Sequence, residues 1–284
     1  MPTIAFQGEP GAYSHLACRS VHPDWEVMPC RAFEDAFQAV HGGAADLAMI
    51  PVENSIAGRV ADVHHLLPQG GLHIVGEHYQ RVVHHLLALP GTDLKDLSEV
   101  HSHIQGLSQC RSLIRTFGLT PMVHADTAGA ARDVSVWGDK RKAAIASRLA
   151  GEIYGLVSLK ADIADGEHNT TRMLVMAREP KIPPLGSGTA ITTLFFTVRS
   201  VPAALYKALG GFATNGVNIV KLESYMVDGR FTAAQFHADV EGHPDDPAMR
   251  HALEELRFFA RQVTILGVYP AHPFRTDGRA VGDD

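Results

Sequence analysis

The residues whose types best suit chemistry lie between positions 165 and 176, where the sequence reads DGEHNTTRMLVM. A polar run ends in Asn169, Thr170 and Thr171, and Arg172 follows directly. The apolar run Met173–Met176 is typical of a buried strand. Hydroxyl groups, an amide and a guanidinium are therefore predicted at the beginning of a strand. Such groups suit a small polar anion, because a guanidinium can hold a carboxylate and a hydroxyl can assist a leaving group.

Further polar residues follow three other predicted strands. In open α/β sheets, ligands bind outside the carboxyl ends of the strands, so these positions are candidates for the same site. The segments are GEPGAYSH, PVENSIAG and SHIQGLSQC. The residues that they contribute are Ser14, Glu53, Asn54, Ser55, Ser102 and Gln109.

Each of these groups also has a structural explanation. GEPGAYSH could be an ordinary glycine turn before a helix, with Ser14 near the helix start. Asn54 or Ser55 could cap a following helix, and Arg172 could belong to a structural ion pair. From the residues alone, the functional and structural interpretations both remain open.

The elements that must position these residues form two regions. Before a Pro- and Gly-rich linker at 179–190, strand and helix patterns alternate, which indicates mostly parallel sheets covered by helices. Within this part we predict one helix over 59–67 and another near 105–117. After the linker, the order β-α-β-β-α-β over roughly 80 residues is typical of a ferredoxin-like unit. Its two central strands flank the turn signal Asp228-Gly229.

Composition narrows the classes of function. The 284 residues are 45% hydrophobic and 20% charged, with a net charge of -6, so we expect no nucleic acid or membrane partner. Three scattered cysteines, Cys18, Cys30 and Cys110, favour a reducing compartment, and we predict a cytoplasmic protein. The beginning of the sequence reads as a first strand, and no apolar run is long enough to span a membrane.

The sequence predicts no cofactor and no metal. It has no GK[ST] phosphate loop, and GEPGAY departs from GxGxxG. There are 17 histidines, but His64-His65 and His84-His85 are adjacent pairs whose members point apart, and neither pair fits HExxH. We therefore interpret the histidines as surface and packing residues.

At this point a resemblance to a known family adds to the interpretation. GEPGAYSH, PVENSIAG, SHIQGLSQC, AAIAS and DGEHNTTRM occur in the order in which the prephenate dehydratase family has them. After the linker, PAALYKALGGFATNGVNIVKLES resembles the ACT domain of that family. The resemblance covers nearly the whole chain. It implies an α/β catalytic domain at 1–180, two-lobed like a periplasmic binding protein with the site in the cleft, and a βαββαβ ferredoxin-like ACT regulatory domain at 190–272.

The resemblance also implies an activity. The family removes carbon dioxide and the ring hydroxyl from prephenate, and this carbon-oxygen lyase reaction gives phenylpyruvate for L-phenylalanine biosynthesis. Aromatisation drives the reaction. Thr171 matches the threonine thought to assist the departing hydroxide, although Glu53 or a water could instead supply the proton. The expected catalytic residues are Thr171, Glu53, Asn54, Ser102 and Gln109, and the expected substrate-binding residues are Ser14, Ser55, Asn169 and Arg172.

For the ACT domain, the resemblance implies pairing between subunits, in a homodimer or homotetramer, and feedback inhibition by phenylalanine. The expected effector-binding residues are Ala203, Ala204, Leu205, Asn218, Glu223 and Ser224. The chain departs from the family here, because Tyr225 and Met226 replace Arg and Pro, and Ala203 replaces Gly. We expect the effector site to persist with a moderate change in affinity. For the ACT domain, the alternative is a unit that only dimerises. For the whole protein, the alternatives are a sensor that binds its ligand without turnover and an arogenate dehydratase.

Overall fold

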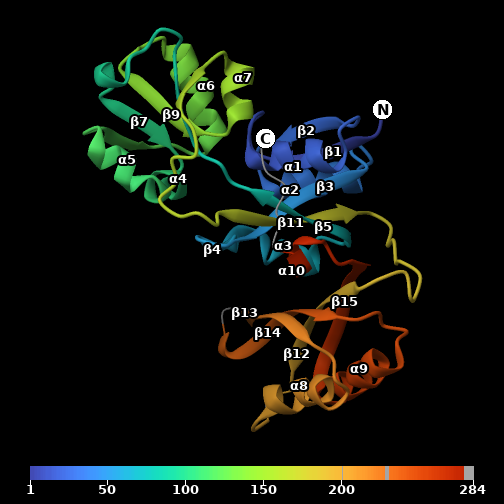
Figure 1. The fold of residues 1–284 in the computed structure, drawn as a ribbon. Helices are drawn as coiled ribbons and strands as arrows, with labels where there is room; N and C mark the ends of the chain where they lie inside the picture. The colour runs from blue at the N-terminus through green and yellow to red at the C-terminus, as the bar shows by residue number, and fades with distance from the viewer. Residues whose placement is uncertain (200, 228–229, 278–284) are drawn as a thin grey trace. The chain divides into compact units, whose positions relative to one another are not determined.

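The computed structural model describes residues 1–199, 201–227 and 230–277 and divides into two compact units (Figure 1). The first contains Met1–Val63 and His78–Leu174, together with the chain from Asp277 onward. The second contains His64–Glu77 and Val175–Thr276.

A sheet in which β1, β2 and β3 run parallel forms one half of the first unit. Strand β1 pairs in parallel with β2 on one side and β3 on the other, and β11 begins beside β3. Ile4, Phe6 and Met49 are fully buried between this sheet and its helices. The elements are β1 (Thr3–Gln7), α1 (Tyr13–Val21), β2 (Glu26–Cys30), α2 (Phe33–His41), β3 (Leu47–Asn54), β4 (Gly58–Arg59) and β11 (Thr170–Ala177).

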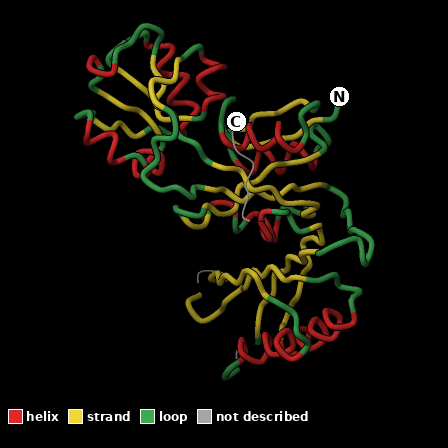
Figure 2. The backbone as a smooth tube through the Cα atoms, in the orientation of Figure 1, coloured by secondary structure: helices red, strands yellow, loops and turns green. Residues whose placement is uncertain are grey.

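A second, five-stranded sheet forms the other half, in the order β10-β6-β9-β7-β8. Figure 2 shows its strands in yellow with helices in red beside them. Strands β7, β8 and β9 run parallel, whereas β6 and β10 are antiparallel to their neighbours. Small alanine side chains let helix α6 pack closely on β9. The elements are β6 (His85–Ala88), β7 (Glu99–Ser102), α4 (Ile104–Gln109), α5 (Arg111–Thr116), β8 (Thr120–Val123), α6 (Thr127–Trp137), β9 (Lys142–Ala146), α7 (Arg148–Tyr154) and β10 (Val157–Lys160).

The second unit contains the predicted β-α-β-β-α-β order, in an antiparallel sheet β13-β14-β12-β15. The predicted turn Asp228-Gly229 lies outside the described residues. Strand β15 also pairs with β5, where a Cβ at Gly267 would lie 2.1 Å from the carbonyl oxygen of Ile74, so only glycine fits. The elements are α3 (Leu66–Gln69), β5 (His73–Arg81, in part), β12 (Ala190–Val198), α8 (Ala204–Thr214), β13 (Ile219–Val227), β14 (Arg230–Glu241), α9 (Pro247–Phe259), β15 (Ala260–Pro270) and α10 (Phe274–Asp277, in part).

Two helix predictions were wrong in detail. The segment 59–67 contains the end of β4, a 3₁₀ turn at Ala61–Val63 and the start of the short helix α3. Its helical spacing of apolar residues was misleading because the hairpin with β3 draws Arg59 into a strand. The predicted helix 105–117 is interrupted at Cys110, whose φ of -123° and ψ of 30° are not helical. Within the described ranges, no helix is both long and apolar enough to cross a membrane.

Candidate active site

The end of β3 and the beginning of β11 meet through the side chain of Asn54. Its Nδ2 donates to Asn169 Oδ1 at 2.7 Å and to Thr171 Oγ1 at 3.0 Å. Its Oδ1 accepts the backbone N–H groups of Ile56 and Ala57, at 3.0 and 2.8 Å. These two acceptor contacts fix which end of the amide faces Thr171.

This orientation has a consequence for the Thr171 hydroxyl. Because its oxygen accepts a hydrogen bond from Asn54, its own proton is directed elsewhere and can be donated to another group. A threonine hydroxyl held this way can stabilise negative charge that develops on a leaving oxygen.

The network continues from Asn169 into the second sheet of the same unit. Gln109 Oε1 accepts from Asn169 Nδ2 at 2.9 Å and contacts His84 Nε2 at 2.8 Å. His84 Nδ1 lies 2.9 Å from the Tyr13 hydroxyl, which also reaches the carbonyl of Val83 at 2.8 Å. Burial lowers the pKa of His84, which favours a neutral ring that donates from Nε2 to Gln109.

Sequence reasoning missed two members of this network, Tyr13 and His84. From the sequence we interpret His84 as a surface or packing residue, because the adjacent pair His84-His85 does not fit a metal-binding motif. His84 lies inside an otherwise apolar strand pattern, which indicates a buried position. Because a buried imidazole requires polar partners, this pattern could have predicted that His84 belongs to a hydrogen-bond network. Tyr13 lies inside the GEPGAYSH segment, next to the predicted residue Ser14. Ser14 itself is buried in the first turn of α1.

Arg172 has a carboxylate partner within the chain. Its Nη1 lies 2.9 Å from Glu53 Oε1, and its side chain is 3% exposed whereas that of Glu53 is 34% exposed. A buried guanidinium needs such a partner to offset its desolvation. The contact supports the alternative that Arg172 has a structural role, and it joins β3 to β11 a second time.

The predicted serine residues are hydrogen-bonded to backbone groups. Ser102 is fully buried at the end of β7, where its hydroxyl donates to the carbonyl of Ile145 at 2.7 Å. Ser55 Oγ donates to the carbonyl of His168 and accepts the N–H of Thr170 at 2.9 Å. Of the predicted residues, hydrogen bonds between side chains join Asn54, Gln109, Asn169 and Thr171 into one set. Ser55 bonds the backbone beside this set, and Glu53 and Arg172 form a separate pair on the same two strands.

The predicted effector residues divide into two groups in the second unit. Ala203, Ala204 and Leu205 line a pocket of about 530 Å³ at the beginning of α8. Ala203 has a φ of 57° and a ψ of 26°, in the left-handed region where glycine is favoured. Asn218 Nδ2 donates to Glu241 Oε2 at 2.9 Å, and Glu223 lies beside Lys221 on β13. Ser224 is exposed on the same strand.

The profile of the prephenate dehydratase family matches residues 4–181. The chain belongs to the prephenate dehydratase family. It is therefore an enzyme of that family, and the connected set described above lies within the matched segment.

Relatives support this assignment over most of the chain. A bifunctional N-acyl-homoserine lactone acylase/prephenate dehydratase of Komagataeibacter europaeus is 55% identical, across 96% of this chain and 97% of its own length. An Arabidopsis thaliana arogenate dehydratase/prephenate dehydratase is 40% identical across 94% of this chain and 71% of its own. The structure of an Arthrobacter aurescens prephenate dehydratase in complex with L-Phe has a TM-score of 0.87 and 28% identity, across 95% of this chain and 90% of that one.

Proposed function

We propose that the chain converts prephenate to phenylpyruvate at the connected polar residues of the first unit. The observation that carries the proposal is the hydrogen bond from Asn54 to Thr171, which leaves the threonine proton available to the substrate. Thr171 donates to the ring hydroxyl as its C–O bond breaks, while the ring carboxylate leaves as carbon dioxide. The electron pair of the broken C–C bond enters the ring and makes it aromatic, and the C–O electron pair leaves with the hydroxyl. The departing oxygen takes the Thr171 proton and leaves as water, and Thr171 regains its proton from solvent, so that each turnover consumes one proton.

The role of the protein in this reaction is mainly orientation. Asn169 and Gln109 hold Asn54 and Thr171 in one arrangement through contacts of 2.7 to 3.0 Å. Preorganised donors aimed at developing charge lower the barrier without reorganising during the reaction. Glu53 is the alternative proton donor, and one of its carboxylate oxygens pairs with Arg172 at 2.9 Å.

We also propose a regulatory arrangement. Residues 1–180 are the catalytic domain, two-lobed like a periplasmic binding protein, and 190–272 are an ACT domain that binds phenylalanine and pairs between subunits. The β-α-β-β-α-β order and the pocket beside Ala203 support an effector-binding role, as does the L-Phe complex of the Arthrobacter aurescens relative. Glu223 and Ser224 remain the expected contacts of the effector on β13.

Turnover of two substrates tests the proposal. Purified full-length protein is incubated with prephenate or with arogenate, and formation of phenylpyruvate or phenylalanine is followed by ultraviolet absorbance and chromatography. We expect phenylpyruvate from prephenate, and inhibition by added phenylalanine. Faster turnover of arogenate would make the chain an arogenate dehydratase, and binding of both substrates without turnover would make it a sensor.

A second activity, hydrolysis of an N-acyl-homoserine lactone, is suggested by the Komagataeibacter europaeus relative, which matches almost end to end. In that reaction water adds across the amide C–N bond and releases a fatty acid and homoserine lactone. Mass spectrometry of both products after incubation with an acyl-homoserine lactone tests it. Absence of both products from an enzyme preparation that turns over prephenate would limit the chain to the dehydratase reaction.

A further inference from the structure

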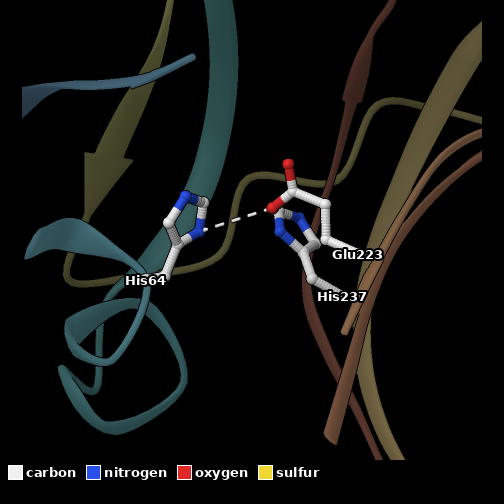
Figure 3. Close-up of side chains that lie close together, drawn as sticks. All are labelled: His64, Glu223 and His237. Atoms are coloured by element: carbon white, nitrogen blue, oxygen red, sulfur yellow. Dashed lines mark ion pairs between the residues drawn. The ribbon is translucent and has the colours of Figure 1, made fainter. Parts of the chain in front are cut away.

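A compact group of imidazole and carboxylate side chains lies in the second unit (Figure 3). His64 precedes α3, Glu223 lies on β13 and His237 lies on β14, so three separate segments contribute. His64 Nδ1 is 3.8 Å from Glu223 Oε2, and one ligand-type atom of each residue lies within 4.8 Å of the others. Figure 3 shows the three side chains directed toward one another.

The burial of the group sets it apart from a surface cluster. His64 and His237 are 4% and 1% exposed, and the Glu223 side chain is 22% exposed. Within the described residues, neither ring nitrogen of His237 has a hydrogen bond. Its Nε2 lies 3.4 Å from Asp239 Oδ1, which is within ion-pair reach but outside hydrogen-bond geometry. A buried imidazole in this condition indicates a ligand, since buried ring nitrogens are nearly always hydrogen-bonded or coordinated.

The donor set matches a borderline divalent ion. Two imidazoles and one carboxylate are a recurrent ligand set for zinc, which then keeps a fourth position for another group. A tetrahedral ion with bonds of about 2.0–2.1 Å holds its ligand atoms roughly 3.3 Å apart. Small side-chain rotations would therefore bring the group into coordination geometry.

The neighbouring groups favour this arrangement. Asp239 lies beside His237 as the carboxylate that commonly orients a metal-bound histidine. The Tyr225 hydroxyl lies 2.8 Å from His64 Nδ1 and also contacts Glu223 Oε2, so it is positioned at the fourth site. Lys221 contacts the other oxygen, Glu223 Oε1, at 3.1 Å and leaves Oε2 facing His64.

Charged groups lie beside the proposed ligands. Lys221 contacts Glu223 at 3.1 Å, and Arg275 lies 2.6 Å from Glu77 and 3.9 Å from Asp239, so each of these carboxylates has a cationic neighbour among the described residues.

We propose that His64, Glu223 and His237 form a binding site for a zinc-class divalent metal ion, with the Tyr225 hydroxyl at the fourth position. The proposal reverses the expectation of no metal drawn from the sequence, and it is independent of the dehydratase site. The ion would tie the segment that begins at His64 to strands β13 and β14, and would stabilise the second unit by binding only its folded form.

Direct metal binding tests the proposal. Full-length protein stripped with EDTA is titrated with zinc by calorimetry, without phenylalanine, and cobalt is added separately as a spectroscopic probe. We expect one high-affinity zinc ion per chain, a rise in Tm on zinc binding, and the intense visible bands of four-coordinate cobalt. Magnesium, which prefers oxygen ligands in octahedral geometry, should leave Tm unchanged.

Glu223→Gln and His237→Gln keep the size of each side chain and remove a ligand. We expect each to weaken zinc binding by more than about 100-fold, because loss of even an outer partner costs 10–100-fold. His65→Gln is the matched control, since His65 is the exposed neighbour of His64. Circular dichroism checks that all three variants fold. Unchanged zinc affinity in both ligand variants, or equal loss in the His65 control, would overturn the proposal.

Discussion

The polar group around Thr171 and the polar group around His237 differ in how completely their side chains hydrogen-bond to one another. Around Thr171, amides and hydroxyls face one another in complementary pairs at 2.7 to 3.0 Å. Around His237, imidazoles and carboxylates lie 3.4 to 3.8 Å apart, and the ring of His237 makes no hydrogen bond among the described residues. We propose that the first group orients the substrate and that the second binds a cation.

The difference shows what each group requires. Loss of a hydroxyl from a small dianion needs fixed donors and weak acids, which amides and threonine supply without binding a metal. A cation requires lone pairs that are directed inward. Those of His237 make no hydrogen bond among the described residues, whereas His64 and Glu223 share the Tyr225 hydroxyl, which a bound ion would draw into its fourth position. The predictions that follow test the comparison, beginning with the largest expected effect.

Removing the Thr171 hydroxyl is the strongest test of the first group. Thr171→Ala should lower kcat by about 10²–10⁴-fold, the usual range for a group that donates a proton in the transition state. KM should change much less, because the hydroxyl acts mainly on the leaving group. Steady-state kinetics with prephenate measures both parameters. Thr171→Ser, which keeps the hydroxyl, is the control, and near-full kcat in Thr171→Ala would remove the threonine from the mechanism.

Arg172→Met separates a structural ion pair from a substrate clamp. The change should lower the free energy of unfolding by about 1–3 kcal/mol. This is less than breaking a fully buried pair, because the Glu53 carboxylate left behind is 34% exposed and partly hydrated. Urea unfolding measures this loss. If unfolding is unaffected while KM rises strongly, Arg172 instead holds a substrate carboxylate, as first predicted from the sequence. Arg178→Met, at an exposed arginine after the same strand, is the matched control.

The buried His84 predicts a pH dependence of stability. Burial lowers its pKa in the folded state, so the unfolded chain takes up a proton first as the pH falls. Stability should therefore be full above the ordinary histidine pKa of about 6.5 and decline below it, by up to about 1.4 kcal/mol per pH unit. Urea unfolding at several pH values measures the slope. His84→Gln should reduce the slope, and an unchanged slope would assign it to other histidines such as His15 and His101, whose pKa values burial also lowers.

Ala203→Gly should have the smallest effect, and it should raise the stability of the protein, whereas Arg172→Met should lower it. A left-handed backbone costs an alanine about 1 kcal/mol, which glycine does not pay, so the variant should unfold at a higher temperature. Calorimetric unfolding measures the shift. Ala204→Gly is the control, because Ala204 begins the regular helix α8 and should lose stability on the same change. A lower Tm for Ala203→Gly would contradict a strained backbone at this position.

The sequence by itself predicted a large part of this organisation. The alternation of strands and helices before the linker and the β-α-β-β-α-β order after it follow from local hydrophobic periodicity, and both appear in the structure. The sequence also predicted polar residues at the end of β3 and the beginning of β11, because a polar cluster next to an apolar strand pattern can be recognised from neighbouring residues alone. The helix predicted over 59–67 failed where pairing with β3 overrode the local pattern.

Only the tertiary structure decided which polar groups meet. Asn54 contacts Asn169 and Thr171 across 115 and 117 positions, and no local pattern encodes such a pairing. The pairing of Arg172 with Glu53 is equally non-local. So is the group of His64, Glu223 and His237, in which histidines interpreted from the sequence as surface and packing residues become part of a proposed metal site. Periodicity depends on neighbours along the chain, whereas hydrogen-bond and coordination partners depend on how distant strands align when the sheets assemble.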